Sequence, residues 1–181
     1  SERLGREIII ENRGGAGGII GIGMVAKSEP DGYTLLMTSP EFIINPFFHK
    51  IPSDPVKSFV PVARLVAGSR VLSVHPSVPA NSVKEFIALA KNRPGKLVYA
   101  STGVGSDAHL AGELFKMMAG IDFLTVQFKS GGQMMTDVLG GHSHWMLGTV
   151  TLSLSQIKAG KLKALGFSGS VRSKLIPDVP T

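Results

Sequence analysis

Short apolar runs alternate along the chain with segments in which apolar residues recur every three or four positions. An apolar run bounded by turn residues is typical of a buried strand, and the longer spacing is typical of an amphipathic helix. We therefore expect an α/β architecture. The expected strands are 7–11, 33–37, 60–66, 71–75, 97–100, 122–128, 145–147 and 163–167. The expected helices are 19–27, 82–92, 107–119, 133–139 and 152–159, with a further short helix within 38–46.

Turn residues separate these elements and suggest a division of the chain. Pro30-Asp31-Gly32 is a turn, and glycine-rich loops at 13–18 and 101–106 precede expected helices. Ser82-Val83-Lys84-Glu85 has the form of a capping box at a helix start. The small residues of Ala67-Gly68-Ser69-Arg70 interrupt two expected strands, so we expect a lobe boundary there.

The part of the chain from Arg70 onward is a run of strand–loop–helix units. Such units build parallel sheets, in which ligands bind beyond the carboxyl ends of the strands. Three expected strand ends carry glycines and short hydroxyl side chains without a positioned acid or base, which indicates a binding cleft and not a reaction centre. The candidate ligand-binding residues at these ends are Ser101, Thr102, Gly103, Gly105, Ser106, His109, Lys129, Ser130, Gly131 and Thr149.

Composition and charge limit the classes of binding partner that the chain is expected to have. The chain has 181 residues, of which 43% are hydrophobic and 18% charged, as expected for a folded core and not for a disordered chain. Residues 1–69 contain seven Lys/Arg and seven Asp/Glu, whereas residues 70–181 contain twelve and six, so the net charge of +6 lies in the second part. A basic part attracts anions. The basic residues are dispersed, with only two Tyr and one Trp, so nucleic acid is not an expected partner.

Several kinds of segment and site are not expected. No window approaches about eighteen consecutive apolar residues, so we expect no direct membrane insertion. No basic-then-apolar leader opens the chain, so no signal peptide is expected within it. The chain has no Cys, which excludes disulfides and thiolate metal sites. His142 and His144 have no evident third ligand beside them, so we expect surface histidines and no metal.

The loop Gly103-Val104-Gly105-Ser106-Asp107-Ala108 has the spacing of a phosphate-binding loop and lies between an expected strand and an expected helix. The next strand ends at 126–129 without the acid that a dinucleotide's ribose requires. A similar match at 21–26 lies inside an expected helix, where it suits helix packing. A glycine loop before a helix offers N–H groups and a positive dipole end to any anion, carboxylates included. An α/β enzyme that binds a phosphate or nucleotide at Gly103–Ser106 therefore stays the alternative function.

Ser106, Asp107 and His109 do not form a catalytic triad. They share one helical turn, and no G-x-S-x-G elbow is present. We expect Ser106 to cap the helix and to offer its hydroxyl to a ligand. His109 is expected to face either the ligand or the core. No residue is assigned a catalytic role, and no cofactor is expected.

An ordered series of motifs covers essentially the whole chain. It begins with Glu11-Asn12-Arg13-Gly14-Gly15-Ala16-Gly17-Gly18 and continues with Ala26-Lys27 and Pro30-Asp31-Gly32-Tyr33-Thr34-Leu35-Leu36. Further motifs lie at 45–46, 54–57, 74–79, 91–97, 109–115, 139–141, 157–162 and 177–181. The series closely resembles the substrate-binding proteins of tripartite tricarboxylate transporters, the Bug family.

The resemblance implies a periplasmic, periplasmic-binding-protein-like receptor of the type II venus-flytrap class, with two lobes and largely parallel sheets. Residues 1–69 would be part of the first lobe, 70–168 the second lobe, and 169–181 a return segment toward the first lobe, so that the chain would be a fragment lacking both ends. The implied ligand is a small carboxylate, the implied partners are the membrane permease subunits, and no catalysis is implied. The matching strand ends add Thr38 and Ser39 to the ligand-binding residues given above.

Two positions depart from the family's pattern. Gly148-Thr149 stands where many members have Asp or Asn, which disfavours amino-acid ligands. Gln127-Phe128 replaces a commoner Pro-Tyr pair and so removes a phenolic hydroxyl. A third possibility for function is that this chain alone binds nothing, because half of the site is absent from it.

Overall fold

The computed structural model describes residues 5–13, 18–51 and 53–181. The chain divides into two compact units, Ser1–Val62 (unit 1) and Ala63–Thr181 (unit 2). The division of the protein into lobes at residues 69 and 168, with a return segment after them, stays a prediction.

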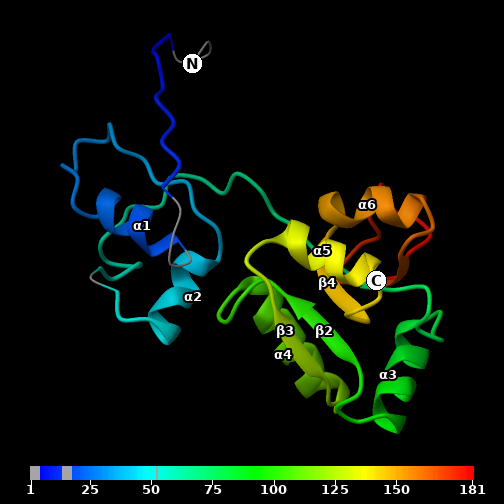
Figure 1. Ribbon diagram of the computed structural model, residues 1–181. Helices are drawn as coiled ribbons and strands as arrows, with labels where there is room; N and C mark the ends of the chain where they lie inside the picture. Colours follow the sequence, from blue (N-terminus) through cyan, green and yellow to red (C-terminus); the bar gives the residue numbers. More distant parts are fainter. Residues whose placement is uncertain (1–4, 14–17, 52) are drawn as a thin grey trace. The chain divides into compact units, whose positions relative to one another are not determined.

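Unit 1 contains two short helices, α1 (Ile19–Val25) and α2 (Glu41–Phe48) (Figure 1). The helix expected at 19–27 is confirmed, and the short helix expected within 38–46 begins at Glu41 and extends past Pro46. The rings of Phe42 and Phe59 pack edge to face with centroids 5.0 Å apart. Of the glycine loop expected at 13–18, residues 14–17 lie outside the described residues.

The predictions of strands at 7–11, 33–37 and 60–66 are wrong. These segments have no regular secondary structure, and among the described residues of unit 1 no strand is formed. Their apolar side chains, such as Ile9, Ile10 and Met37, are exposed. An extended segment becomes a strand only when a neighbouring backbone pairs with its N–H and C=O groups, and the described part of unit 1 supplies no such neighbour.

Unit 2 is built on a five-stranded sheet with the order β3-β2-β4-β1-β5. Its strands are β1 (Arg70–Val74), β2 (Val98–Ser101), β3 (Leu124–Gln127), β4 (Trp145–Thr149) and β5 (Lys163–Phe167). β2 pairs in parallel with β3 and β4, whereas β1 pairs antiparallel with β4 and β5. Four strands therefore run in one direction, and β1 alone runs against them.

Helices cover both faces of this sheet, which gives unit 2 three layers (Figure 1). The helices α3 (Val83–Asn92) and α4 (Asp107–Ala119) pack on one face, and α5 (Gly131–Leu139) and α6 (Val150–Lys158) pack on the other. All four were expected within a few residues of these bounds. A mixed sheet between two helical layers confirms the α/β class.

Trp145 is the centre of the larger core. Its ring is fully buried and lies 4.3 Å from the ring of Tyr99, 4.9 Å from Phe123 and 5.0 Å from Phe86, measured between centroids. Aromatic rings bury large apolar areas, and edge-to-face pairs add to the stabilisation. This cluster joins β2, β4, α3 and the segment before β3 into one packed body.

Close packing also fixes α4 on the sheet. Gly112 of α4 lies directly on the ring of Tyr99, so that an added Cβ would be 2.3 Å from Cε1 of the ring. The Tyr99 hydroxyl donates a hydrogen bond of 2.5 Å to the carbonyl of Ala108 in the first turn of α4. The start of α4 therefore has a defined position at the end of β2.

The last residues of the chain pack on unit 2. Ile176 and Val179 are buried beside Val71 of β1. The N–H of Phe167 at the end of β5 donates to the carbonyl of Pro180 over 2.8 Å. Residues beyond β5 therefore add to the core of unit 2.

Candidate functional site

Three adjacent parallel strands, β3, β2 and β4, end at the same edge of the unit 2 sheet, and each end leads into a helix. We call the segments 101–106, 128–130 and 148–149, which include the last residues of β2 and β4, the strand-end loops. Their last residues Ser106, Ser130 and Thr149 cap α4, α5 and α6. Each hydroxyl accepts a hydrogen bond from the third N–H of its helix, at 3.1 to 3.3 Å. Three helix N-termini are thus directed toward one edge of the sheet.

This arrangement suits an anion. Helix N-termini carry partial positive charge and N–H groups that lack partners within the helix. A hydroxyl that accepts from the backbone can still donate its own proton to a ligand. The starts of α5 and α6 are also neighbours, since a Cβ on Gly131 would lie 3.3 Å from Cδ2 of Leu152.

The glycine loop between β2 and α4 is held by its own neighbours. Gly103 and Gly105 have φ angles of +105° and +80°, which other residues rarely adopt. The Gly103 N–H donates to Oε1 of Gln127 over 2.8 Å, and the Gly105 N–H donates to Nδ1 of His109 over 3.3 Å. These two N–H groups therefore fix the shape of the loop and are not directed at a ligand.

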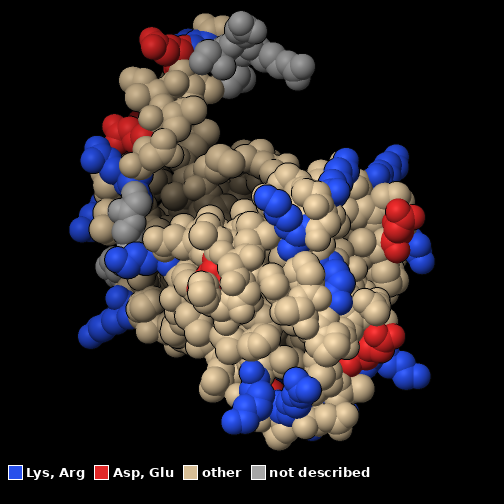
Figure 2. All heavy atoms as spheres, turned by 45° about the vertical axis from the view of Figure 1, so that its right-hand side comes forward, with Lys and Arg blue, Asp and Glu red and all other residues tan. Residues whose placement is uncertain are grey.

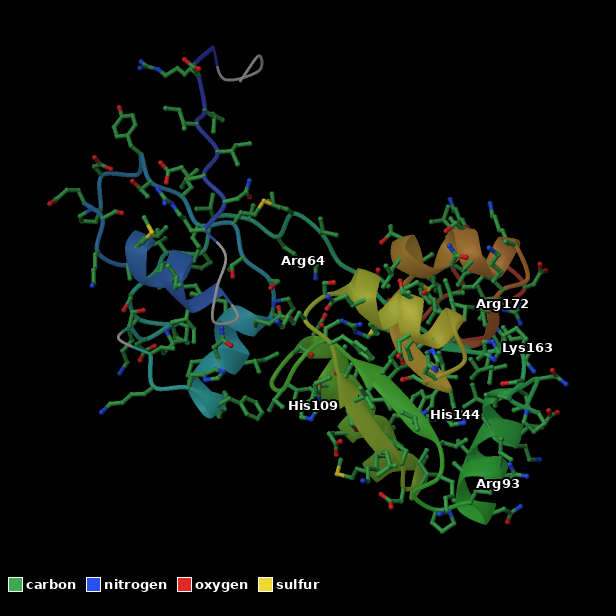
Figure 3. The ribbon with its side chains drawn as sticks, in the orientation of Figure 1. Arg64, Arg93, His109, His144, Lys163 and Arg172 are labelled. Atoms are coloured by element: carbon green, nitrogen blue, oxygen red, sulfur yellow. The ribbon has the colours of Figure 1, made fainter. Side chains whose placement is uncertain are left out.

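His109 has a structural role in this loop. Because its Nδ1 accepts from Gly105, the proton of the neutral ring is on Nε2. Figure 3 shows His109 at the loop end of α4, and the side chain is half-buried. His109 thus braces the loop through Nδ1, and the expectation that it faces either the ligand or the core stays a prediction.

The remaining candidates differ in exposure. Lys129, Ser130 and Thr149 are exposed, and Thr102 and Gly131 are half-buried. Ser101 is fully buried, and within the described structure its hydroxyl has no hydrogen-bond partner. The Ser101 side chain therefore lies in the interior, beneath the loop and not on its surface.

Thr38 and Ser39 belong to unit 1. Both are exposed, and the Ser39 hydroxyl donates to the carboxylate of Glu41 in the first turn of α2. Their approach to the strand-end loops of unit 2 stays a prediction.

Arg70 is a functional candidate that the sequence interpretation missed. Because β1 runs against β4, its first residue, Arg70, lies opposite Thr149 at the edge that carries the strand-end loops. The guanidinium donates to the carbonyl of Leu147 over 2.7 Å and forms an ion pair with Asp107, the first residue of α4. A basic residue at the start of an antiparallel strand would have signalled this position, but the direction of β1 is not visible in the sequence.

His144, which was expected at the surface, lies at the opposite edge of the sheet, directly before β4. His144 is half-buried, its Nδ1 accepts from the N–H of Val98 over 2.9 Å, and burial lowers the pKa of its ring. Groups of three or more His, Asp or Glu able to bind a metal ion are absent from the described residues.

Two hollows are lined by residues outside the strand-end loops. One of about 150 Å³ is lined by residues that include Arg93, Lys96 and His144 at the opposite edge of the sheet. The other, of about 270 Å³, lies in unit 1 between Phe42, Phe59 and Pro61.

Lys and Arg side chains stand at separate places on the face in Figure 2 and do not form one continuous patch. In residues 5–13, 18–51 and 53–181, helices long and apolar enough to cross a bilayer are absent.

A three-layer α/β unit with capped helices around one sheet edge is typical of ligand-binding proteins of the periplasmic-binding-protein class, and similar solved structures include such proteins. The chain belongs to the family described as "Tripartite tricarboxylate transporter family receptor", whose model matches residues 1–181. The family resemblance and the expected fold class are thereby confirmed. The family is one of solute-binding receptors that act in the periplasm.

Individual relatives agree with this assignment. The chain is 36% identical to Protein BugT of Bordetella pertussis, over 99% of this chain and 56% of that protein. It is similar to the R. palustris protein Rpa4515, solved with adipate, at 32% identity and a TM-score of 0.88, over 99% of this chain and 61% of that one. It is also similar to MatC from Rhodopseudomonas palustris with bound malate, at 29% identity and a TM-score of 0.83, over 99% and 62%. The chain spans about half the length of the curated relatives it matches.

Proposed function

We propose that this chain serves in a periplasmic receptor that captures a small carboxylate and delivers it, chemically unchanged, to the permease subunits of a tripartite tricarboxylate transporter. The observation that carries the proposal is the convergence of three capped helix N-termini on one edge of the sheet. Carboxylates are stabilised at such N-termini. The proposal includes no catalytic residue and no cofactor.

The ligand class follows from chemistry and from relatives. Two similar proteins hold adipate and malate, which are both dicarboxylates. The strand-end loops of unit 2 would bind one carboxylate through N–H groups and hydroxyls, with Lys129 adding positive charge. The proposed ligand-binding residues are Thr38, Ser39, Thr102, Ser106, His109, Lys129, Ser130, Gly131 and Thr149, with Ser101, Gly103 and Gly105 shaping the loop.

The alternative is an α/β enzyme that binds a phosphate or nucleotide at Gly103–Ser106. A phosphate-binding loop directs successive backbone N–H groups at the phosphate. Here the Gly103 and Gly105 N–H groups donate to Gln127 and His109. This use of the loop's donors favours the receptor over the enzyme.

A thermal-shift panel separates the two functions. A ligand at about one hundred times its dissociation constant stabilises the folded protein by about 2.7 kcal/mol. We expect adipate or malate to raise the melting temperature of the full-length protein, and ATP and NAD to leave it unchanged. Stabilisation by a nucleotide alone would contradict the carboxylate receptor and favour a nucleotide-binding function.

A substitution that keeps the helix cap tests the site itself. Asp and Asn both cap helices as well as Ser does, so Ser130→Asp and Ser130→Asn keep α5 intact and differ by one negative charge. We expect Ser130→Asp to weaken malate or adipate binding about tenfold or more, because two carboxylates would then face each other. The matched Ser130→Asn variant is expected to stay within about threefold of the wild type, measured by isothermal titration calorimetry. Equal affinities of the two variants would place the ligand away from α5.

A further inference from the structure

Arg70 and Asp107 form an ion pair at the edge of the proposed site. The Arg70 side chain is only 17% exposed and that of Asp107 is 40% exposed. A second guanidinium nitrogen of Arg70 donates to the carbonyl of Leu147 in β4 over 2.7 Å. The Arg70 backbone is tied to Ser168, whose hydroxyl accepts from the Arg70 N–H over 2.8 Å and whose N–H donates to the Arg70 carbonyl over 2.9 Å. The cation is therefore held in one place by three segments of unit 2.

The negative charge of Asp107 disfavours an anionic ligand at this place. It is the first residue of α4, so its carboxylate lies at the same positive helix end that would attract a ligand carboxylate. An uncompensated Asp107 would repel a dianion and attract an ammonium group. An arginine beside it cancels the charge, and the fork of the guanidinium suits a carboxylate partner.

We propose that Arg70 is a specificity-determining residue that occupies Asp107 and thereby makes the site select dicarboxylates without an ammonium group over amino-dicarboxylates. The inference rests on the proposed function, because it assigns a preference to that same site. Arg70 acts through Asp107 and does not itself contact the ligand. Gly148-Thr149 at the end of β4 places no acid beside this pair, so Asp107 is the carboxylate that Arg70 has to neutralise at this edge.

Malate and aspartate are a matched pair of probes, since they differ only by a hydroxyl in place of an ammonium group. We expect the full-length wild type to bind malate at least about tenfold more tightly than aspartate. Arg70→Gln keeps a polar side chain but removes the charge. Its malate affinity is expected to fall about tenfold while its aspartate affinity rises, as measured by calorimetry at constant ionic strength.

The double variant Arg70→Gln/Asp107→Asn separates the possible roles of Arg70. Removing both charges is expected to return malate binding to within about threefold of the wild type and to abolish the gain for aspartate. Weak malate binding in the double variant would show that Arg70 contacts the ligand directly. Equal losses for malate and aspartate in Arg70→Gln would show a purely structural role. Either result overturns the inference.

Two further measurements complete the test. Arg93→Gln removes one positive charge at the opposite end of unit 2, at the end of α3 (Figure 3), and is expected to leave the malate-to-aspartate ratio unchanged. Asp107→Asn, which keeps Arg70 and its bond to Leu147, is expected to bind malate at least as tightly as the wild type, so the inference stays testable if Arg70→Gln fails to fold.

A wild type that binds neither malate, adipate nor aspartate would overturn the proposed function and this inference together. A wild type that binds malate, with variants that shift both ligands equally, would overturn the inference alone.

Discussion

Unit 1 and unit 2 contain the same kind of apolar run but use it differently. Ile9 and Ile10 of unit 1 are 81% and 80% exposed, whereas Val71 and Leu72 of unit 2 are 0% and 4% exposed. The unit 2 run pairs with β4 and β5 and is covered by helices, while the unit 1 run has no strand beside it in the described residues. An apolar run therefore specifies a strand only together with its partners.

The largest expected difference between the units concerns their aromatic residues. Trp145→Ala removes the centre of the unit 2 core and is expected to lower the free energy of unfolding by about 3–5 kcal/mol. Phe42→Ala in unit 1 removes one edge-to-face pair and is expected to cost about 1 kcal/mol. Urea unfolding followed by far-UV circular dichroism measures both.

Trp145 also supplies the control for that experiment. It is the only Trp of the chain, so its fluorescence in Phe42→Ala reports unit 2 alone. An unchanged fluorescence midpoint in Phe42→Ala is expected. A shift as large as that measured by circular dichroism would mean that the two units unfold as one.

Helical glycines provide a second contrast, of intermediate size. Gly112→Ala in α4 would bring a Cβ to 2.3 Å from the Tyr99 ring, and overpacking of this kind costs about 1–3 kcal/mol. Gly23→Ala in α1 meets nothing within 4 Å and replaces glycine by a better helix former, which stabilises a helix by about 0.5–1 kcal/mol. The same substitution is thus expected to have opposite signs, measured as the Trp fluorescence midpoint for Gly112→Ala and as hydrogen exchange of the α1 peptide for Gly23→Ala. A stabilising Gly112→Ala would contradict the packing of α4 on Tyr99.

The smallest expected effect is on the pH dependence of unit 2. Burial, with a smaller contribution from His75, holds the pKa of His144 below its usual value of 6.5. A depressed folded pKa adds stability above pH 6.5, and this stability is lost as the pH falls through the lower folded value. Protonation also ends the hydrogen bond that Nδ1 accepts from Val98.

The measurement compares urea midpoints at pH 7.5 and pH 5. The wild type is expected to lose stability at the lower pH, and His144→Gln is expected to lose less. His142→Gln removes an exposed neighbouring ring and is expected to behave like the wild type. An identical loss in all three proteins would show that His144 does not contribute to the pH dependence of stability.

The helices of unit 2 could be predicted because their signals are local. Ser82 accepts from the Glu85 N–H as a capping box predicts, although the Glu85 carboxylate accepts from the Asn81 N–H and not from that of Ser82. The expected range 107–119 for α4 matches its bounds, with Ser106 as its cap. Side chains within four residues of one another determine these features, so a single sequence displays them.

Features that depend on the alternation of side chains along a strand and on strand direction were predicted less accurately than the helices. β2 ends at Ser101 and not at Ala100 as expected, and this one residue places the Ser101 side chain on the buried face that it shares with Tyr99. Arg70 was missed because nothing near it in the sequence shows that β1 runs against its neighbours. The unit 1 strands were expected from apolar runs whose partners the described structure does not contain.

The hydrogen bonds of Gly103 with Gln127 and of Gly105 with His109 have a kinetic consequence. They hold the loop at the end of β2 in one conformation without help from a ligand. A preorganised loop loses little conformational entropy when a ligand arrives. At the proposed site, association would then be limited by the encounter with the ligand and not by ordering of the loop, and differences in affinity between ligands would appear as differences in how slowly they leave.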